Sequence, residues 1–151
     1  MIWSNLAAMT LISTFTIPCP PTRSRPRARY HGLAKEYPLI LIAGTKLEMY
    51  THSEMRNIPG LQRRFPENLL EINPETAATF GIAEGDLVRI SSPRGSIRCK
   101  ALLTDRIDLR VVHLCHGFKE SSCNVLTDHK AFDPITGSTG LKSLLCRLEK
   151  I

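Results

Sequence analysis

The sequence predicts a mostly-β fold with short helices. About six short runs have the length and composition of strands, either apolar throughout or alternating apolar and polar residues. Turn residues separate these runs, with one or two short helical patterns between them. The chain has 151 residues, of which 42% are hydrophobic, enough to bury one core of ordinary size. Many short strands with few helices favour a barrel.

The first predicted strand, 37–43 (YPLILIA), is rich in isoleucine and leucine and ends at Gly44, as a buried strand does. A polar loop is predicted to follow, from Gly44 to about Pro66. Loops longer than about 12–15 residues in compact domains are usually functional or disordered. The other predicted strands are 69–72, 87–91, 96–103, 110–115 and 144–148.

A short helix is predicted directly after the second strand. Asn73 is a good N-cap, Pro74 fits the first turn, and Glu75 suits the positive end of the helix dipole. Gly81 is expected to end the helix, and residues 83–86 to form a turn. The expected apolar face of the helix consists of Ala77, Ala78 and Phe80.

The later strands show alternation and a hairpin. Residues 87–91 (LVRIS) alternate as a half-buried strand does, and Pro93-Arg94-Gly95 predicts a hairpin turn before 96–103. In 110–115, Val112 and Leu114 are expected on one face, with His113 on the other. A polar segment is predicted from His116 to about Gly140.

The N-terminal part differs in composition from the rest. Residues 18–29 (PCPPTRSRPRAR) combine proline with spaced arginines, which predicts an extended linker. Residues 1–18 are apolar but lack the basic start and cleavage site of a signal peptide, and are too short and polar for a membrane span. We therefore expect a disordered or unrelated tail over 1–36 and one domain over 37–151, with no membrane span.

Charge and cysteine content limit the function classes. The net charge is +6, and residues 1–36 supply +4 of it, so the domain itself is near neutral and predicts no nucleic-acid groove. Five cysteines without CxxC spacing argue against a disulfide framework or a zinc site, which favours a cytoplasmic location. The cysteines are Cys19, Cys99, Cys115, Cys123 and Cys146.

No catalytic motif stands out in the chain. It has no serine elbow, no HExxH, no phosphate-binding loop and no glycine-rich dinucleotide fingerprint. His113 and His116 are three residues apart along a strand, so they are expected to point to opposite faces and not to share a metal. We predict neither catalytic residues nor a protein-bound metal.

The order of these segments resembles a known family. YPLILIAG, then YTHSEMRNIPGL, then EINPETAATFGIAEGDLVRISSPRGSIRCKALLTDRI is similar to the molybdopterin dinucleotide-binding domain that ends the catalytic subunits of the dimethyl-sulfoxide-reductase family. NVLTDHKAFDPITGSTGLKSLLCRLEK continues the match. SEMRNIPGL and DPITGSTGLKSLLCR lean toward the thiosulfate or polysulfide reductase and acetylene hydratase branch. The resemblance implies a double-psi β-barrel that binds molybdopterin guanine dinucleotide, with molybdenum or tungsten held by that cofactor.

Such a cofactor needs backbone donors, cations for its diphosphate and polar groups for its ring edges. Gly44 permits close approach after a strand, and Lys46 can meet a phosphate, although an ordinary strand-end turn is the alternative. His52 is either a pterin contact or a solvated histidine, and Lys142 either a cofactor contact or a surface lysine. Asn124 matches a recurrent asparagine of the family. The candidate cofactor-binding residues are Gly44, Thr45, Lys46, Tyr50, Thr51, His52, His116, Asn124 and Lys142.

The resemblance implies that the chemistry resides elsewhere. We expect the chain to bind the cofactor as the C-terminal domain, fragment or subunit of a molybdenum or tungsten oxidoreductase, without catalysis by itself. Its expected partners are the iron–sulfur and catalytic domains. The alternative is a non-catalytic interaction module, or a remnant that no longer binds cofactor. Asp128 and Asp133 could accept hydrogen bonds from guanine, but capping a turn is the favoured role.

Overall fold

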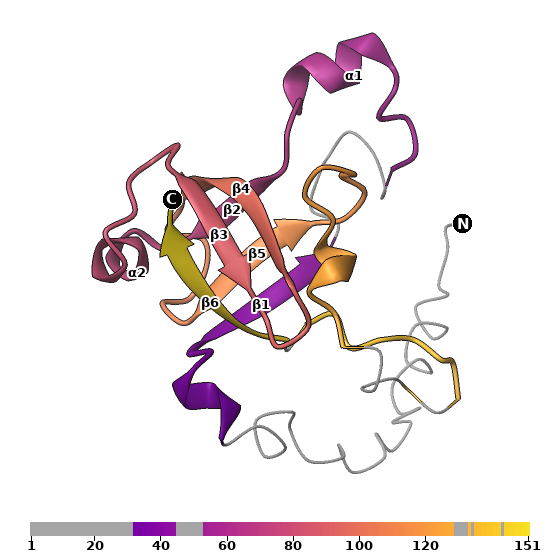
Figure 1. Cartoon of the computed structure of the whole chain (residues 1–151). Helices are drawn as coiled ribbons and strands as arrows, with labels where there is room; N and C mark the ends of the chain where they lie inside the picture. The colour runs from indigo at the N-terminus through magenta and orange to yellow at the C-terminus, as the bar shows by residue number, and fades with distance from the viewer. Residues whose placement is uncertain (1–31, 45–52, 129–132, 134, 143) are drawn as a thin grey trace, which may run out of the picture.

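In this computed structural model, the residues described are 32–44, 53–128, 133, 135–142 and 144–151. Six strands close into a barrel in the order β1-β5-β2-β4-β3-β6 (Figure 1). The mostly-β prediction is thus confirmed. The strands are β1 (Leu39–Gly44), β2 (Leu69–Ile72), β3 (Leu87–Ser91), β4 (Ser96–Leu103), β5 (Val111–Cys115) and β6 (Leu144–Lys150). The helical segments are η2 (Leu33–Lys35), α1 (Pro59–Arg64), α2 (Pro74–Thr79) and η3 (Cys123–Val125).

The strand directions give the barrel two distinct ends. β1 runs parallel to β5, and β2 runs parallel to β4, while the other four pairs are antiparallel. One end therefore collects the carboxyl ends of β1, β3 and β5 with the amino ends of β2, β4 and β6. We call this the loop end; its described residues are 53–68, 92–95, 116–128 and 135–142. The opposite, α2 end is formed by residues 32–38, 73–86 and 104–110.

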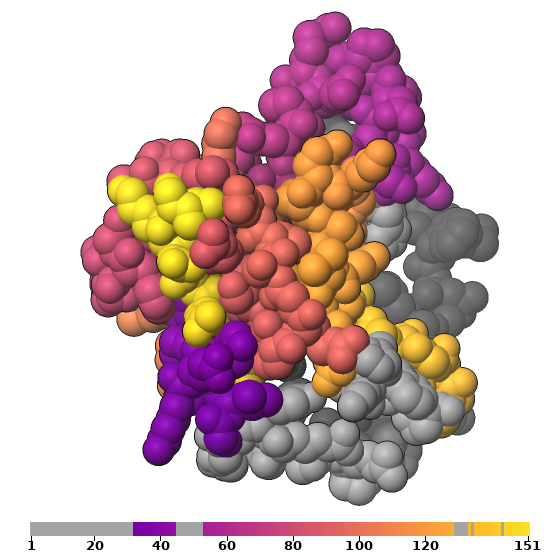
Figure 2. Space-filling model, viewed as in Figure 1, coloured from indigo at the N-terminus to yellow at the C-terminus, as the bar shows by residue number. Residues whose placement is uncertain are grey.

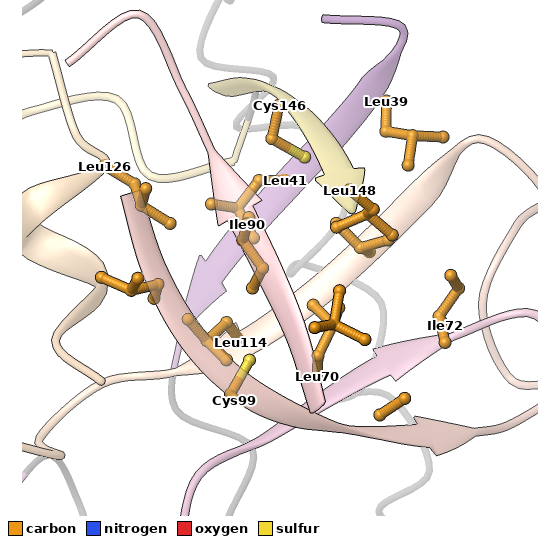
Figure 3. Close-up of a cluster of buried hydrophobic side chains, with 14 of the residues drawn as sticks. Leu39, Leu41, Leu70, Ile72, Ile90, Cys99, Leu114, Leu126, Cys146 and Leu148 are labelled. Atoms are coloured by element: carbon orange, nitrogen blue, oxygen red, sulfur yellow. The ribbon is translucent and has the colours of Figure 1, made fainter. Parts of the chain in front are cut away.

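Alternate strand residues fill the inside of the barrel (Figure 3). Val112 and Leu114 are fully buried in this core, which confirms the expected face of β5. Three cysteines also belong to the core, Cys99, Cys123 and Cys146, and burial raises the pKa of the Cys99 and Cys146 thiols to about 12. They act as small hydrophobic residues there, because a thiol with such a pKa stays neutral and unreactive at neutral pH.

The predicted α2 helix forms nearly as expected. The Asn73 side chain accepts a hydrogen bond from Glu75 N at 3.0 Å, and Gly81 follows the helix with φ +64°. The predicted apolar face was wrong at Ala78, which is exposed, whereas Thr76 is buried. Thr76 faces inward because its hydroxyl donates to the Leu109 carbonyl, a partner that the local pattern does not show.

Several predicted boundaries were also wrong, each for a local reason. β1 starts at Leu39, because Pro38 has no N–H for the ladder. β5 starts after Arg110, whose N–H instead donates to Asp108 Oδ1 at 3.1 Å. The predicted loop 44–66 contains α1, which begins at Pro59, a residue suited to a first helical turn. β6 extends to Lys150, where it pairs with Val88.

α1 stands away from the barrel. None of its residues is buried, and Figure 2 shows its segment projecting beyond the rest of the described chain. Met55 and Ile58, just before it, are 53% and 48% exposed. Within the described residues, no helix is both long and apolar enough to cross a membrane.

Candidate functional site

The candidate site lies at the loop end, where the barrel places its two longest connections and the β3–β4 hairpin. Four of the nine predicted cofactor-binding residues fall within the described chain, and strand pairing puts the segments that carry them at this end. These four are Gly44, His116, Asn124 and Lys142. The other five, Thr45, Lys46, Tyr50, Thr51 and His52, lie outside the described residues.

Gly44 and His116 are joined through the backbone. Gly44 pairs with Cys115 across the parallel β1–β5 ladder, and His116 N donates to Gly44 O at 3.0 Å. Among the described residues, a Cβ added at Gly44 would meet only His113 Nε2, at 3.9 Å, which is ordinary contact. Because local packing does not require glycine there, the lack of a side chain leaves the backbone open to a group from outside.

Lys142 lies next to the end of β1. The preceding residue, Leu141, accepts a hydrogen bond through its carbonyl from Ala43 N at 2.7 Å. This contact ties the segment before β6 to the strand that ends at Gly44. The Lys142 side chain is exposed, so it can meet an anion without a large desolvation cost.

Asn124 is held close to His116 by its neighbour Cys123. The Cys123 thiol lies 3.1 Å from His116 Nδ1 and is buried, which raises its pKa. Asn124 itself is exposed, and its backbone carbonyl accepts from Thr127 Oγ1 at 2.9 Å. Its amide side chain thus lies on a fixed turn, with both donor and acceptor capacity.

The β3–β4 hairpin packs against this turn. A Cβ at Gly95 would come within 2.8 Å of Val125 Cγ1 and 3.1 Å of Val125 O. Glycine is therefore required at this hairpin position by close backbone approach. The contact fixes η3, which carries Asn124, against the barrel.

The loop end also contains a stacked cation, Arg56, that the sequence did not predict. The Arg56 guanidinium lies over the Phe118 ring, 4.0 Å from its centroid, and 4.0 Å from Glu120 Oε2. Phe118 is 3% exposed, so the ring is a fixed platform. Arg56 and Phe118 are 62 positions apart, and no local pattern links them.

A pocket opens beside Phe118 on the outer surface of the barrel. It encloses about 370 Å³ of space that is partly open to solvent. Its wall combines aromatic rings, leucines and carboxylates with one asparagine and one cysteine. The lining residues are Phe65, Glu67, Asn68, Leu69, Glu71, Leu102, Cys115 and Phe118.

Asn68 is the buried polar residue of this pocket, with 4% exposure. Its Nδ2 donates to Cys115 O at 2.9 Å and Ser121 O at 3.3 Å, which uses both amide hydrogens. None of the residues that the structure describes donates to its Oδ1. A buried acceptor without a donor costs about 1–3 kcal/mol, so this atom is a candidate ligand contact. The sequence shows only an asparagine before a strand, which usually means a turn.

Glu71 and His113 form a cross-strand pair that borders the same pocket. The two residues are opposite each other in the β2–β5 ladder, and Glu71 Oε2 lies 3.5 Å from His113 Nδ1. His113 is buried on the outer face of β5, as the alternation predicts. In the described part of the chain, no group of three or more potential metal ligands occurs.

Asp133 has a structural role. Its carboxylate accepts from Ile135 N, Thr136 N and Thr136 Oγ1 at 3.0, 2.8 and 3.1 Å. These hydrogen bonds, the one from Thr136 N first, lower the pKa of Asp133 below its ordinary value. The turn-capping alternative for this residue is therefore confirmed.

Comparison with known families identifies the domain. Residues 39–145 match the model described as "Molydopterin dinucleotide binding domain". The chain belongs to this family, and its cofactor is molybdopterin dinucleotide. It is similar to the C-terminal region of molybdenum oxidoreductases.

Individual relatives are much longer than this chain. It is 36% identical over 128 residues to dopamine dehydroxylase of Eggerthella lenta, spanning 77% of the chain and 13% of that protein. It is also 36% identical over 118 residues to F420-dependent formate dehydrogenase 2 subunit alpha of Methanococcus maripaludis, spanning 78% and 17%. Among solved structures, acetylene hydratase from Pelobacter acetylenicus matches with TM-score 0.74 and 20% identity, over 83% of the chain and 20% of that structure. This last likeness shows the shared fold.

Three structural features of the loop end fit such a cofactor. It offers an open backbone at Gly44, an exposed cation at Lys142 and a buried acceptor at Asn68 Oδ1. Backbone donors and cations suit a diphosphate, and a buried acceptor suits a ring edge that carries N–H groups.

Proposed function

We propose that residues 37–151 hold molybdopterin guanine dinucleotide at the loop end, as the C-terminal domain, fragment or subunit of a larger molybdenum or tungsten oxidoreductase. The observation that supports this most is the convergence of segments far apart in sequence: the end of β1, the turn after β5 and the segment before β6 meet through two backbone hydrogen bonds. Residues 1–36 are then a tail outside this domain.

The residues divide the task according to their chemistry. Gly44 allows the backbone to approach a phosphate, and Lys142 supplies a positive charge there. His116 and Asn124 orient the base or pterin through hydrogen bonds. We also assign cofactor binding to the residues that follow Gly44 within eight positions of the sequence. These are Thr45, Lys46, Tyr50, Thr51 and His52.

The cofactor, when bound, supplies the metal that exchanges electrons or activates substrate, so the chain needs no catalytic residue of its own. The chain spans 13–20% of the three matched proteins named above. Its proposed partners are the iron–sulfur and catalytic domains, in the same or separate chains, in the cytoplasm. We propose a double-psi barrel, supported by the two parallel strand pairs.

Titration of the purified chain with isolated molybdopterin guanine dinucleotide tests this function. We expect saturable binding at micromolar concentrations, weakened by Lys142→Ala but not by Arg106→Ala, a charge-matched change at the α2 end. A folded chain that binds no cofactor at high micromolar concentration would remove the binding claim and leave only shared ancestry.

The alternative, a non-catalytic interaction module, has one observation in its favour. α1 buries none of its residues, and Met55 and Ile58 beside it are exposed. Such apolar surface favours association. Size-exclusion chromatography with light scattering distinguishes the two hypotheses. Concentration-dependent oligomers that are abolished in the double variant Met55→Ser/Ile58→Ser favour the interaction module. A monomer at all concentrations opposes it.

A further inference from the structure

We propose that Asn68 recognises a 2-amino-4-oxopyrimidine edge through its buried Oδ1 atom, in the pocket beside Phe118. This edge occurs in both the guanine and the pterin of the cofactor. The inference rests on the proposed function and adds a contact residue outside the loops that the sequence singled out.

The orientation of the Asn68 amide is fixed by its neighbours. Nδ2 faces two carbonyl oxygens, those of Cys115 and Ser121, at 2.9 and 3.3 Å. A flipped amide would place its oxygen against both carbonyls, which is repulsive. Oδ1 therefore keeps its position, buried and without a donor among the described residues.

The walls of the pocket select a flat, donor-bearing ligand. Phe65 and Phe118 supply aromatic rings, and Leu69 and Leu102 supply apolar surface. The polar side chains that line the space, those of Asn68, Glu67 and Glu71, each carry an acceptor oxygen. An aminopyrimidinone presents a ring N–H and an amino group side by side on a planar ring, so it matches both features.

The carboxylates are partly engaged within the protein, which leaves Asn68 as the specific acceptor. Glu67 Oε1 accepts from Lys100 Nζ at 2.8 Å, and Glu71 Oε2 lies 3.5 Å from His113 Nδ1. Asn68 is also the most deeply placed of the three. An acceptor that is desolvated before the ligand arrives loses no water on binding, which makes its hydrogen bond selective.

The pocket shares a backbone segment with the proposed cofactor contacts. Cys115, whose carbonyl holds Asn68, pairs with Gly44 and precedes His116. One backbone segment therefore positions both the phosphate-facing glycine and the ring-facing asparagine.

The test changes the ligand and leaves the protein intact. GDP and IDP differ only in the 2-amino group, so this pair isolates the proposed donor. Lumazine carries a carbonyl oxygen where pterin has its 2-amino group, so the second pair replaces the donor by an acceptor at the same position. We expect GDP to bind about three- to tenfold more tightly than IDP in calorimetry, the effect of one hydrogen bond. A preference confined to pterin over lumazine supports the pterin half as the occupant.

Asn68→Ala should abolish this preference, while Asn57→Ala, a change at an exposed asparagine of the same segment, should preserve it. If Asn68→Ala does not fold, the side-chain amide resonances of Asn68 in the unmodified chain provide the readout, and they should shift with GDP but little with IDP.

Equal binding within both ligand pairs overturns the Asn68 assignment and leaves the proposed function standing. Saturation of the Asn68 signals by arginine amide, without any amino-group preference, overturns it in favour of a protein side chain. If the folded chain binds none of the four ligands nor the whole cofactor, both proposals fail.

Discussion

The two ends of the barrel differ in how their polar groups are hydrogen-bonded. At the α2 end, polar groups are paired within the protein: Asn73 caps α2 and also donates to Ile107 O at 3.1 Å, and Lys150 bonds Asp86 at 2.6 Å. At the loop end, a buried acceptor has no donor among the described residues, and α1 buries none of its residues. The difference supports our proposal that the loop end carries the binding surface.

The loop end nevertheless has an anchor in the core. Leu126 is 1% exposed and belongs to the core cluster. We expect Leu126→Ala to lower the free energy of unfolding by about 2–5 kcal/mol, because it leaves a cavity in the barrel. Urea denaturation measures this.

Val125→Ala is the matched control, since Val125 is 49% exposed; we expect a change within about 0.5 kcal/mol. Equal effects of the two substitutions would show that this segment is not part of the core and would weaken the assignment of Asn124 to a fixed position.

The α2 end should lose stability without losing binding when its cap is removed. Asn73→Ala deletes the N-cap and the hydrogen bond to Ile107, so we expect a loss of about 1–2 kcal/mol in urea denaturation. GDP affinity should be unchanged. A parallel loss of affinity would show that the two ends are coupled.

Acid should weaken the α2 end through Asp86. The hydrogen bond from Lys150, then the one from Ala83 N, lowers the pKa of this carboxyl below its ordinary value of 3.8. A depressed pKa stabilises the folded state above the unfolded pKa, and this stabilisation is lost as the pH falls below about 4. In Asp86→Asn, thermal stability between pH 5 and 2 should fall less steeply than in the unmodified chain. An identical slope would contradict the assignment.

The smallest effect is expected in α1. Gly60 has no neighbour within 4 Å of an added Cβ, so Gly60→Ala adds no clash. In a helix coupled to the barrel, this change would stabilise the fold by about 0.4–1 kcal/mol. Because α1 buries no residue, we expect no measurable change in the free energy of unfolding of the isolated chain. A clear gain would show that α1 is part of the cooperative fold.

The sequence by itself determined the elements whose signals are local. The strands 69–72, 87–91 and 96–103 were predicted with the observed bounds, because alternation and turn residues lie within a few positions of each other. The Asn73 cap was predicted for the same reason. The order of segments also carried the family resemblance, which the family match confirms.

Only the tertiary structure decided how distant residues meet. Strand pairing brings Gly44 to His116, and the Arg56 guanidinium stacks on the Phe118 ring, each across more than 60 positions. The inward turn of Thr76 depends on a carbonyl 33 positions away, and the orphaned Asn68 acceptor depends on two carbonyls 47 and 53 positions away. Hydrogen-bond satisfaction in a closed barrel depends on register between strands, and that register is not visible in local sequence periodicity.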